Sequence, residues 1–172
     1  MDQGRRERLQ ARQEMMRIRL RRQKLSATFR EVARELCADG VRLSKSVPSA
    51  NHRSLGRLAA GPGEDEELHF DWMGNGRVMP WSTDFEAAGL VRVAIAACCP
   101  PDALATVVWS PFEAGLRLKA GDLSDHARRI LRRDWTTWIV AARPSNWIIQ
   151  IGVRSGTVAY SPAVPALADG AE

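Results

Sequence analysis

The chain has 172 residues and a mass of 19.1 kDa, with 45% hydrophobic residues, 26% charged residues and a formal net charge of +5. These proportions are typical of a globular domain and exclude a fully disordered chain. The longest apolar run, 90–101, is too short to cross a bilayer and contains Arg92, and the charged N-terminus does not resemble a signal peptide. We therefore expect a cytoplasmic protein without a membrane partner.

The positive charge is concentrated at one end of the chain. Residues 1–45 contain thirteen basic and six acidic residues, a net charge of +7, so the rest of the chain carries −2. The high isoelectric point of about 9.7 therefore belongs to an N-terminal arm. A basic arm attracts polyanions or an acidic protein surface.

Residues 4–38 contain no proline and no glycine after Gly4, and they are rich in residues that favour helices. Apolar residues recur at spacings of three and four, a heptad-like pattern that Arg22 interrupts once. We call this row the seam; it consists of Ala11, Met15, Ile18, Leu25, Phe29, Val32 and Leu36. The pattern predicts a basic amphipathic helix within 1–43 that stops near Gly40, packs through residues 25–38 and projects through residues 5–22.

Two sets of candidate binding residues follow from this helix. The seam residues expected to pack the helix or to form oligomers are Met15, Ile18, Leu25, Phe29, Val32 and Leu36. The residues expected to contact nucleic acid or an acidic partner are Arg5, Arg6, Arg8, Arg12, Arg17, Arg19, Arg21, Arg22 and Lys24. A homodimer through the seam would double the local positive charge and is compatible with polyanion binding.

Residues 26–44 locally resemble the first helix and turn of the helix-turn-helix segments in site-specific recombinases, with a helix ending in Glu-Leu and a Gly-Val turn. The resemblance implies a second helix within 45–57. It also implies that Ser49, Asn51, His52 and Arg53 face the major groove.

Residues 44–67 contain Ser, Pro, Gly and the acidic run 64–67, which predicts a flexible linker, and residues 162–172 are expected to form a flexible tail. Between them, 68–161 is predicted to be a compact body. Strands are expected at 68–72, 77–81, 104–109, 112–120, 136–142, 147–153 and 157–160, and helices at 83–99 and 122–134. The order ββαββαβββ with short connections predicts an α+β body with a mostly antiparallel sheet and helices on one face.

The body carries all six tryptophans, and packing accounts for most of them. A short turn between their strands is expected to bring Trp138 near Trp147. No phosphate loop, nucleophile elbow or metal motif is present, and the three cysteines do not form a ligand pattern. His126, Arg129 and Tyr160 resemble the histidine, arginine and tyrosine of tyrosine recombinases, but the strand-like segments between them do not fit that family's helical structure.

The sequence predicts no catalytic residue, no cofactor and no metal. Our leading hypothesis is a small binding or adaptor protein whose Arg-rich helix contacts nucleic acid or an acidic protein surface. A self-associating coiled-coil protein that docks into a larger assembly is the alternative. The third hypothesis is a small enzyme with an unrecognised site in the body, in which His69 or His126 lies beside a carboxylate.

Overall fold

The structure is a computed structural model that describes residues 3–47, 76–110, 113–131, 136–141 and 147–162, with side chains described from Arg6 onward. The elements are α1 (Gln3–Ala38), β1 (Ser44–Lys45), β2 (Arg77–Pro80), α3 (Asp84–Cys98), β3 (Leu104–Val108), β4 (Leu116–Lys119), α4 (Ala120–Asp125), α5 (Ala127–Ile130), β5 (Thr137–Ala141), β6 (Ile148–Gly152) and β7 (Thr157–Ser161).

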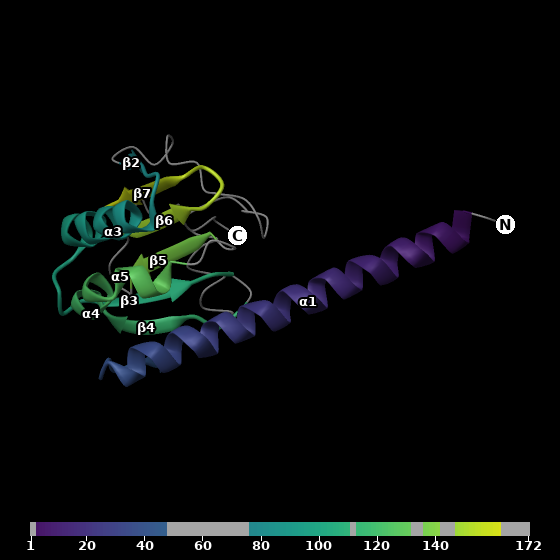
Figure 1. The fold of residues 1–172 in the computed structure, drawn as a ribbon, viewed down its shortest axis with the longest axis horizontal. Helices are drawn as coiled ribbons and strands as arrows, with labels where there is room; N and C mark the ends of the chain where they lie inside the picture. The colour runs from purple at the N-terminus through teal and green to yellow at the C-terminus, as the bar shows by residue number, and fades with distance from the viewer. Residues whose placement is uncertain (1–2, 48–75, 111–112, 132–135, 142–146, 163–172) are drawn as a thin grey trace, which may run out of the picture.

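The body is built on a seven-stranded sheet with the order β1-β4-β3-β5-β6-β7-β2, and every pairing in it is antiparallel. The α+β class with a long N-terminal helix and an antiparallel sheet is therefore confirmed. In Figure 1, α1 runs past the lower edge of the sheet and extends far beyond the body toward its N-terminus.

The hydrophobic core lies between one face of the sheet and the helices. Residues of α1, α3 and α5 join one buried cluster with alternate strand residues such as Val107, Ile139 and Ile149. The other face of the central strands is buried as well, and there Trp138 donates its indole N–H to Gln150 Oε1 at 3.0 Å. Trp147 belongs to the helix-covered core, on the face of the sheet opposite Trp138. The expected proximity of Trp138 and Trp147 is therefore wrong. The β5–β6 register pairs Trp138 with Gln150 instead.

Helix α1 ends as the glycine predicts. Gly40 adopts a φ of +82°, which a residue without a side chain reaches at little cost. The Val41 N–H then donates to the Leu36 carbonyl at 3.0 Å, and the Gly40 N–H donates to the Cys37 carbonyl at 3.0 Å. This bond pair is the Schellman motif, and it is accompanied by burial of both Leu36 and Val41. The motif turns the chain sharply toward β1.

Helix α3 also matches the sequence closely, and its cap is now identified. Thr83 Oγ1 accepts from the Glu86 N–H at 3.2 Å, and Glu86 Oε2 accepts from the Thr83 N–H at 3.1 Å. This reciprocal capping box satisfies two backbone donors that would otherwise lack partners at the helix start.

Residues 68–72, the strand expected before β2, lie outside the described residues.

The second body helix, expected at 122–134, is divided into α4 and α5 at His126. Helix α5 ends at Ile130, whose carbonyl accepts the indole N–H of Trp109 at 3.3 Å. A continuing helix would need that carbonyl for its own backbone bond. Leu131 then leaves the helix in an extended conformation, with a ψ of 124°, and residues 132–135 lie outside the described residues.

The expected linker begins differently from the prediction, because Ser44 and Lys45 form β1 at the edge of the sheet. Ser46 and Gly115 fix this edge: the Ser46 N–H donates to the Gly115 carbonyl and the Gly115 N–H to Ser46 Oγ, both at 2.9 Å. A Cβ atom at Gly115 would lie 2.6 Å from the Val107 carbonyl oxygen, so this approach requires glycine. β4 therefore begins at Leu116, later than the expected 112.

Because Ser44 and Lys45 form a strand and residues 46–47 are not helical, the expected second helix of a helix-turn-helix does not begin at 45–47. Residues 48–67, which include Ser49, Asn51, His52 and Arg53, lie outside the described residues. So do the acidic run 64–67 and the tail residues 163–172.

Substitution of Leu36 by alanine is expected to destabilise the protein by about 3 kcal/mol, because a fully buried leucine leaves a cavity when it is truncated. The matched change Met15→Ala, on the same seam but 68% exposed, is expected to cost less than about 0.5 kcal/mol. Urea unfolding followed by circular dichroism measures both. Equal losses of stability in the two variants would contradict the burial of Leu36 and the exposure of Met15.

Candidate partner-binding groove on α1

The projecting half of α1, residues 3–24, carries the concentrated positive charge. It contains nine basic and two acidic residues. From Arg6 to Lys24 all described side chains are exposed except Ile18 and Arg21, which are half-buried. At about 1.5 Å per residue, this half is about 33 Å long. This half of α1 thus extends away from the body as a positively charged rod (Figure 1).

The seam runs through both halves of α1, but the body covers it only from Leu25 onward. Leu25, Val32 and Leu36 are buried and Phe29 is half-buried against the same core, whereas Ala11 and Met15 are exposed. Arg22, the one charged residue in the seam, lies at this boundary with its Nε 3.6 Å from Glu113 Oε1. The interruption in the heptad pattern therefore coincides with the point where the helix leaves the body.

An open space of about 790 Å³ lies along one face of the helix across this boundary; every described residue that lines it belongs to α1, so the described residues supply one wall of it. We call it the α1 groove; it is lined by Ala11, Arg12, Met15, Met16, Ile18, Arg19, Arg22, Gln23, Ser26 and Arg30. It combines apolar seam residues with four guanidinium groups, and its described lining contains no carboxylate. Such a surface complements a ligand that is both apolar and negatively charged.

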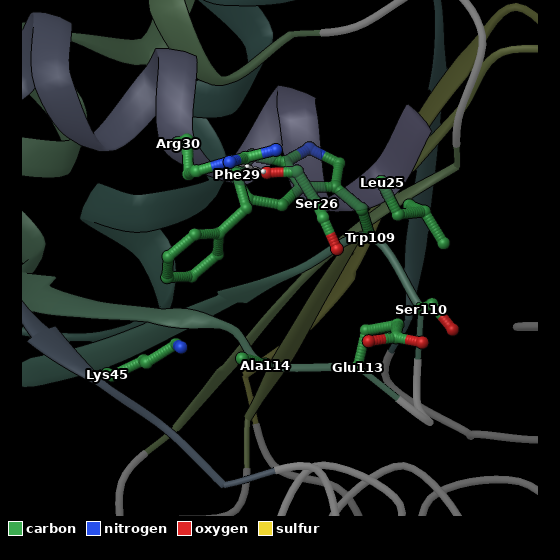
Figure 2. Close-up of a pocket in the computed structure, with 9 residues that line it drawn as sticks. All are labelled: Leu25, Ser26, Phe29, Arg30, Lys45, Trp109, Ser110, Glu113 and Ala114. Atoms are coloured by element: carbon green, nitrogen blue, oxygen red, sulfur yellow. Dashed lines mark hydrogen bonds between the residues drawn. The ribbon is translucent and has the colours of Figure 1, made fainter. Parts of the chain in front are cut away.

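The α1 groove leads into a second cavity at the junction of α1 with the body. This junction cavity has a volume of about 190 Å³ and shares Ser26 and Arg30 with the groove. In Figure 2, α1 contributes residues along one side, and Lys45, Glu113 and Ala114 lie on the other. The full lining is Leu25, Ser26, Phe29, Arg30, Lys45, Trp109, Ser110, Glu113 and Ala114.

The charges around the junction cavity are held in defined positions. Arg30 Nε donates to the Ser26 carbonyl at 3.1 Å, and Lys45 Nζ lies 5.3 Å from the centroid of the Phe29 ring. A cation at this distance from a ring face is attracted by the ring quadrupole. Each of the two cations is therefore held by another residue of the cavity lining, Arg30 by Ser26 and Lys45 by Phe29.

Ion pairs fix the far end of α1 on the body. Arg129 NH2 lies 2.7 Å from Asp39 Oδ2, and Arg129 NH1 lies 3.8 Å from Glu35 Oε2. His126 Nδ1 also lies 3.4 Å from Asp39 Oδ2. With partial exposure each pair contributes little alone. Together they add to the apolar packing that sets the direction of the projecting half.

The predicted basic residues do not all share one face. Arg12, Arg19 and Arg22 line the α1 groove, whereas Arg6, Arg8, Arg17, Arg21 and Lys24 do not, and the side chain of Arg5 lies outside the described residues. Arg17 pairs with Glu14 at 3.8 Å. Sequence reasoning missed Arg30, Lys45 and Glu113, because only the β1–β4 edge brings the last two beside α1.

The described residues hold no group of three or more side chains suited to a metal ion. His126 lies beside Asp39, but it lines neither cavity described above, and His52 and His69 lie outside the described residues. Tyr160 is buried in β7, so the recombinase-like trio of His126, Arg129 and Tyr160 has no open site. In the described part of the chain, no helix is long and apolar enough to cross a membrane.

A third cavity, of about 540 Å³, lies between the end of α3 and α4 and includes Cys99, Ser124 and Asp125. Burial raises the pKa of Cys99, and its Sγ lies 3.6 Å from the Ile95 carbonyl oxygen. The thiolate is therefore disfavoured, which is unlike an activated nucleophile.

No known protein family, curated protein or solved structure matches this chain.

The three cysteines are expected to differ in reactivity. Burial, reinforced by the neighbouring Cys99, raises the pKa of Cys98 from 9.0 to about 12, which lowers its thiolate fraction near pH 8 by about a thousandfold. Cys37 is exposed. Iodoacetamide at pH 8 should therefore alkylate Cys37 first and Cys98 last, as read by mass spectrometry of the folded protein. Prompt alkylation of Cys98 before Cys37 would contradict the burial described here, and unfolding in urea provides the control for full labelling.

Proposed function

We propose that this protein is a non-catalytic binding protein that captures an acidic macromolecule with the projecting half of α1. The observation that carries the proposal is the α1 groove, in which Arg12, Arg19, Arg22 and Arg30 lie beside apolar seam residues, with Arg22 paired to Glu113 at its end nearest the body. Long-range attraction from the charged rod would raise the rate of encounter, and contacts in the groove would hold the partner.

The geometry of the anchor supports this role. Apolar packing, the Schellman turn at Gly40 and the ion pairs of Arg129 fix the end of α1, so the projecting half is presented in one direction. A preorganised surface loses less conformational entropy when it binds a partner. The cytoplasmic location expected from the sequence stays a prediction.

Self-association through the seam is the second candidate, because Ala11 and Met15 are exposed on a heptad row. Sedimentation velocity of the full chain distinguishes it, since a dimer would appear without any added partner. An enzyme with a site in the body has weaker support, because the thiol at the third cavity is disfavoured as a thiolate.

Binding to acidic probes is expected to depend steeply on salt. The full chain should bind a polyglutamate peptide or a duplex DNA of about 20 base pairs, and the affinity should fall at least tenfold between about 50 and 200 mM salt. Fluorescence anisotropy measures this, with a neutral polyglutamine peptide as the control. Absence of binding to every acidic probe at low salt would contradict the proposed function.

A further inference from the structure

We infer that the α1 groove binds an amphipathic helix of a partner protein, with apolar residues along the seam and carboxylates facing Arg12 and Arg19. The inference rests on the proposed function and specifies the class of its acidic partner.

The first argument is the continuity of the seam. From Leu25 to Leu36 its residues pack into the core of the body, and from Ala11 to Ile18 the same heptad row continues into the α1 groove. A helix laid against this part would continue the interface that the body forms further along α1. Heptad rows pack against other helices by inserting side chains between the residues of the facing row.

The second argument is charge. In the heptad of the seam, Arg5, Arg12 and Arg19 occupy equivalent positions seven residues apart, directly beside the apolar row. Arg12 and Arg19 are exposed and line the groove. In helix pairs these flanking positions select the partner through opposite charges. A partner with glutamate or aspartate in the facing positions would satisfy them.

A second copy of the chain fits the groove less well. A parallel, in-register copy would need the face of α1 that the body covers from Leu25 onward. An antiparallel copy avoids the body, but equivalent flanking positions then face each other, and Arg12 and Arg19 of both copies would come together. Like charges across a helix pair oppose it on this flank, whereas Glu14 and Arg21 on the other flank would face opposite charges, so the antiparallel copy stays an outcome of the test below.

Nucleic acid and lipid surfaces also complement the groove only in part. Phosphates would neutralise the arginines but would leave Met15 and Ile18 without apolar contacts. An in-plane membrane helix needs one broad apolar face. Here Leu9 and Leu20, exposed at 51% and 58%, lie on the side of α1 opposite Ile18, with basic residues between the two rows.

The junction cavity defines where the partner helix ends. The body prevents a straight helix from following the seam beyond Leu25, and the cavity between Leu25, Phe29 and Trp109 lies at that end. From Ala11 to Leu25 the seam is about 21 Å long, which corresponds to about four helical turns. An anchoring side chain of the partner can enter the cavity, with Arg30 and Lys45 at its sides.

The test uses the full chain and a synthetic 21-residue peptide of three heptads, with leucine at the two seam positions and glutamate at the flanking positions. A matched peptide replaces every glutamate by glutamine, and another replaces every leucine by serine. Fluorescence anisotropy in about 150 mM salt, where the Debye length is about 8 Å, limits the effect of distant charges. The leucine–glutamate peptide should bind at least tenfold more tightly than either matched peptide.

Paired variants of the protein locate the binding face. R12Q/R19Q removes two positive charges from the groove, and Q10E/Q13E changes the net charge equally at exposed positions outside the groove lining. M15Q/I18Q removes the apolar row of the groove, and L9Q/L20Q makes the same change on the opposite side. The groove variants should each weaken binding at least tenfold and the two controls by less than about threefold.

Other results would overturn the inference in distinguishable ways. Equal effects of R12Q/R19Q and Q10E/Q13E, or tighter binding of duplex DNA than of any peptide, would leave the proposed acidic capture standing and reject the helix partner. A dimer that M15Q/I18Q dissociates would assign the groove to a second copy. Binding that appears only when the acidic residues 64–67 are changed to their amides would mean that the chain's own acidic run occupies the α1 groove in the unchanged protein. No binding of any acidic probe would reject both proposals.

Discussion

The packing of Leu25, Val32 and Leu36 against the core determines the position and direction of α1. These residues belong to a seam that is longer than the body, so the packing that stabilises one half of the helix leaves the other half beyond the edge of the sheet. Helices in proteins gain most of their stability from tertiary packing, and no described side chain of the projecting half is buried. A partner that covers the seam would therefore supply what the body supplies to the other half.

The body gives the helix a fixed base. The β1–β4 edge, with its paired Ser46–Gly115 hydrogen bonds, places Lys45 and Glu113 beside α1. Glu113 then meets Arg22 where α1 leaves the body, and Lys45 lies over Phe29 at the junction cavity. The junction cavity thus depends on the pairing of a two-residue strand.

The helix, its apolar row and its glycine stop could be predicted because they depend on local spacing and on the conformational freedom of Gly40. The α+β class followed from alternating strand patterns and short connections. The end of the second body helix at Ile130 could not be predicted, because it coincides with a hydrogen bond from the indole of Trp109, which is distant in the sequence. A strand of two residues, Ser44 and Lys45, is too short to show an alternating pattern. The sequence therefore could not predict β1 or the junction cavity that β1 helps to form.

Hydrogen–deuterium exchange of the full chain, at low protein concentration, tests the central claim most directly. If the body covers the seam only from Leu25 onward, amides of residues 25–38 should be strongly protected and those of residues 5–22 should exchange rapidly, with protection of 5–22 gained when an acidic helical peptide is added. Strong protection of residues 5–22 without any partner would mean that the seam is already covered, and would contradict the account.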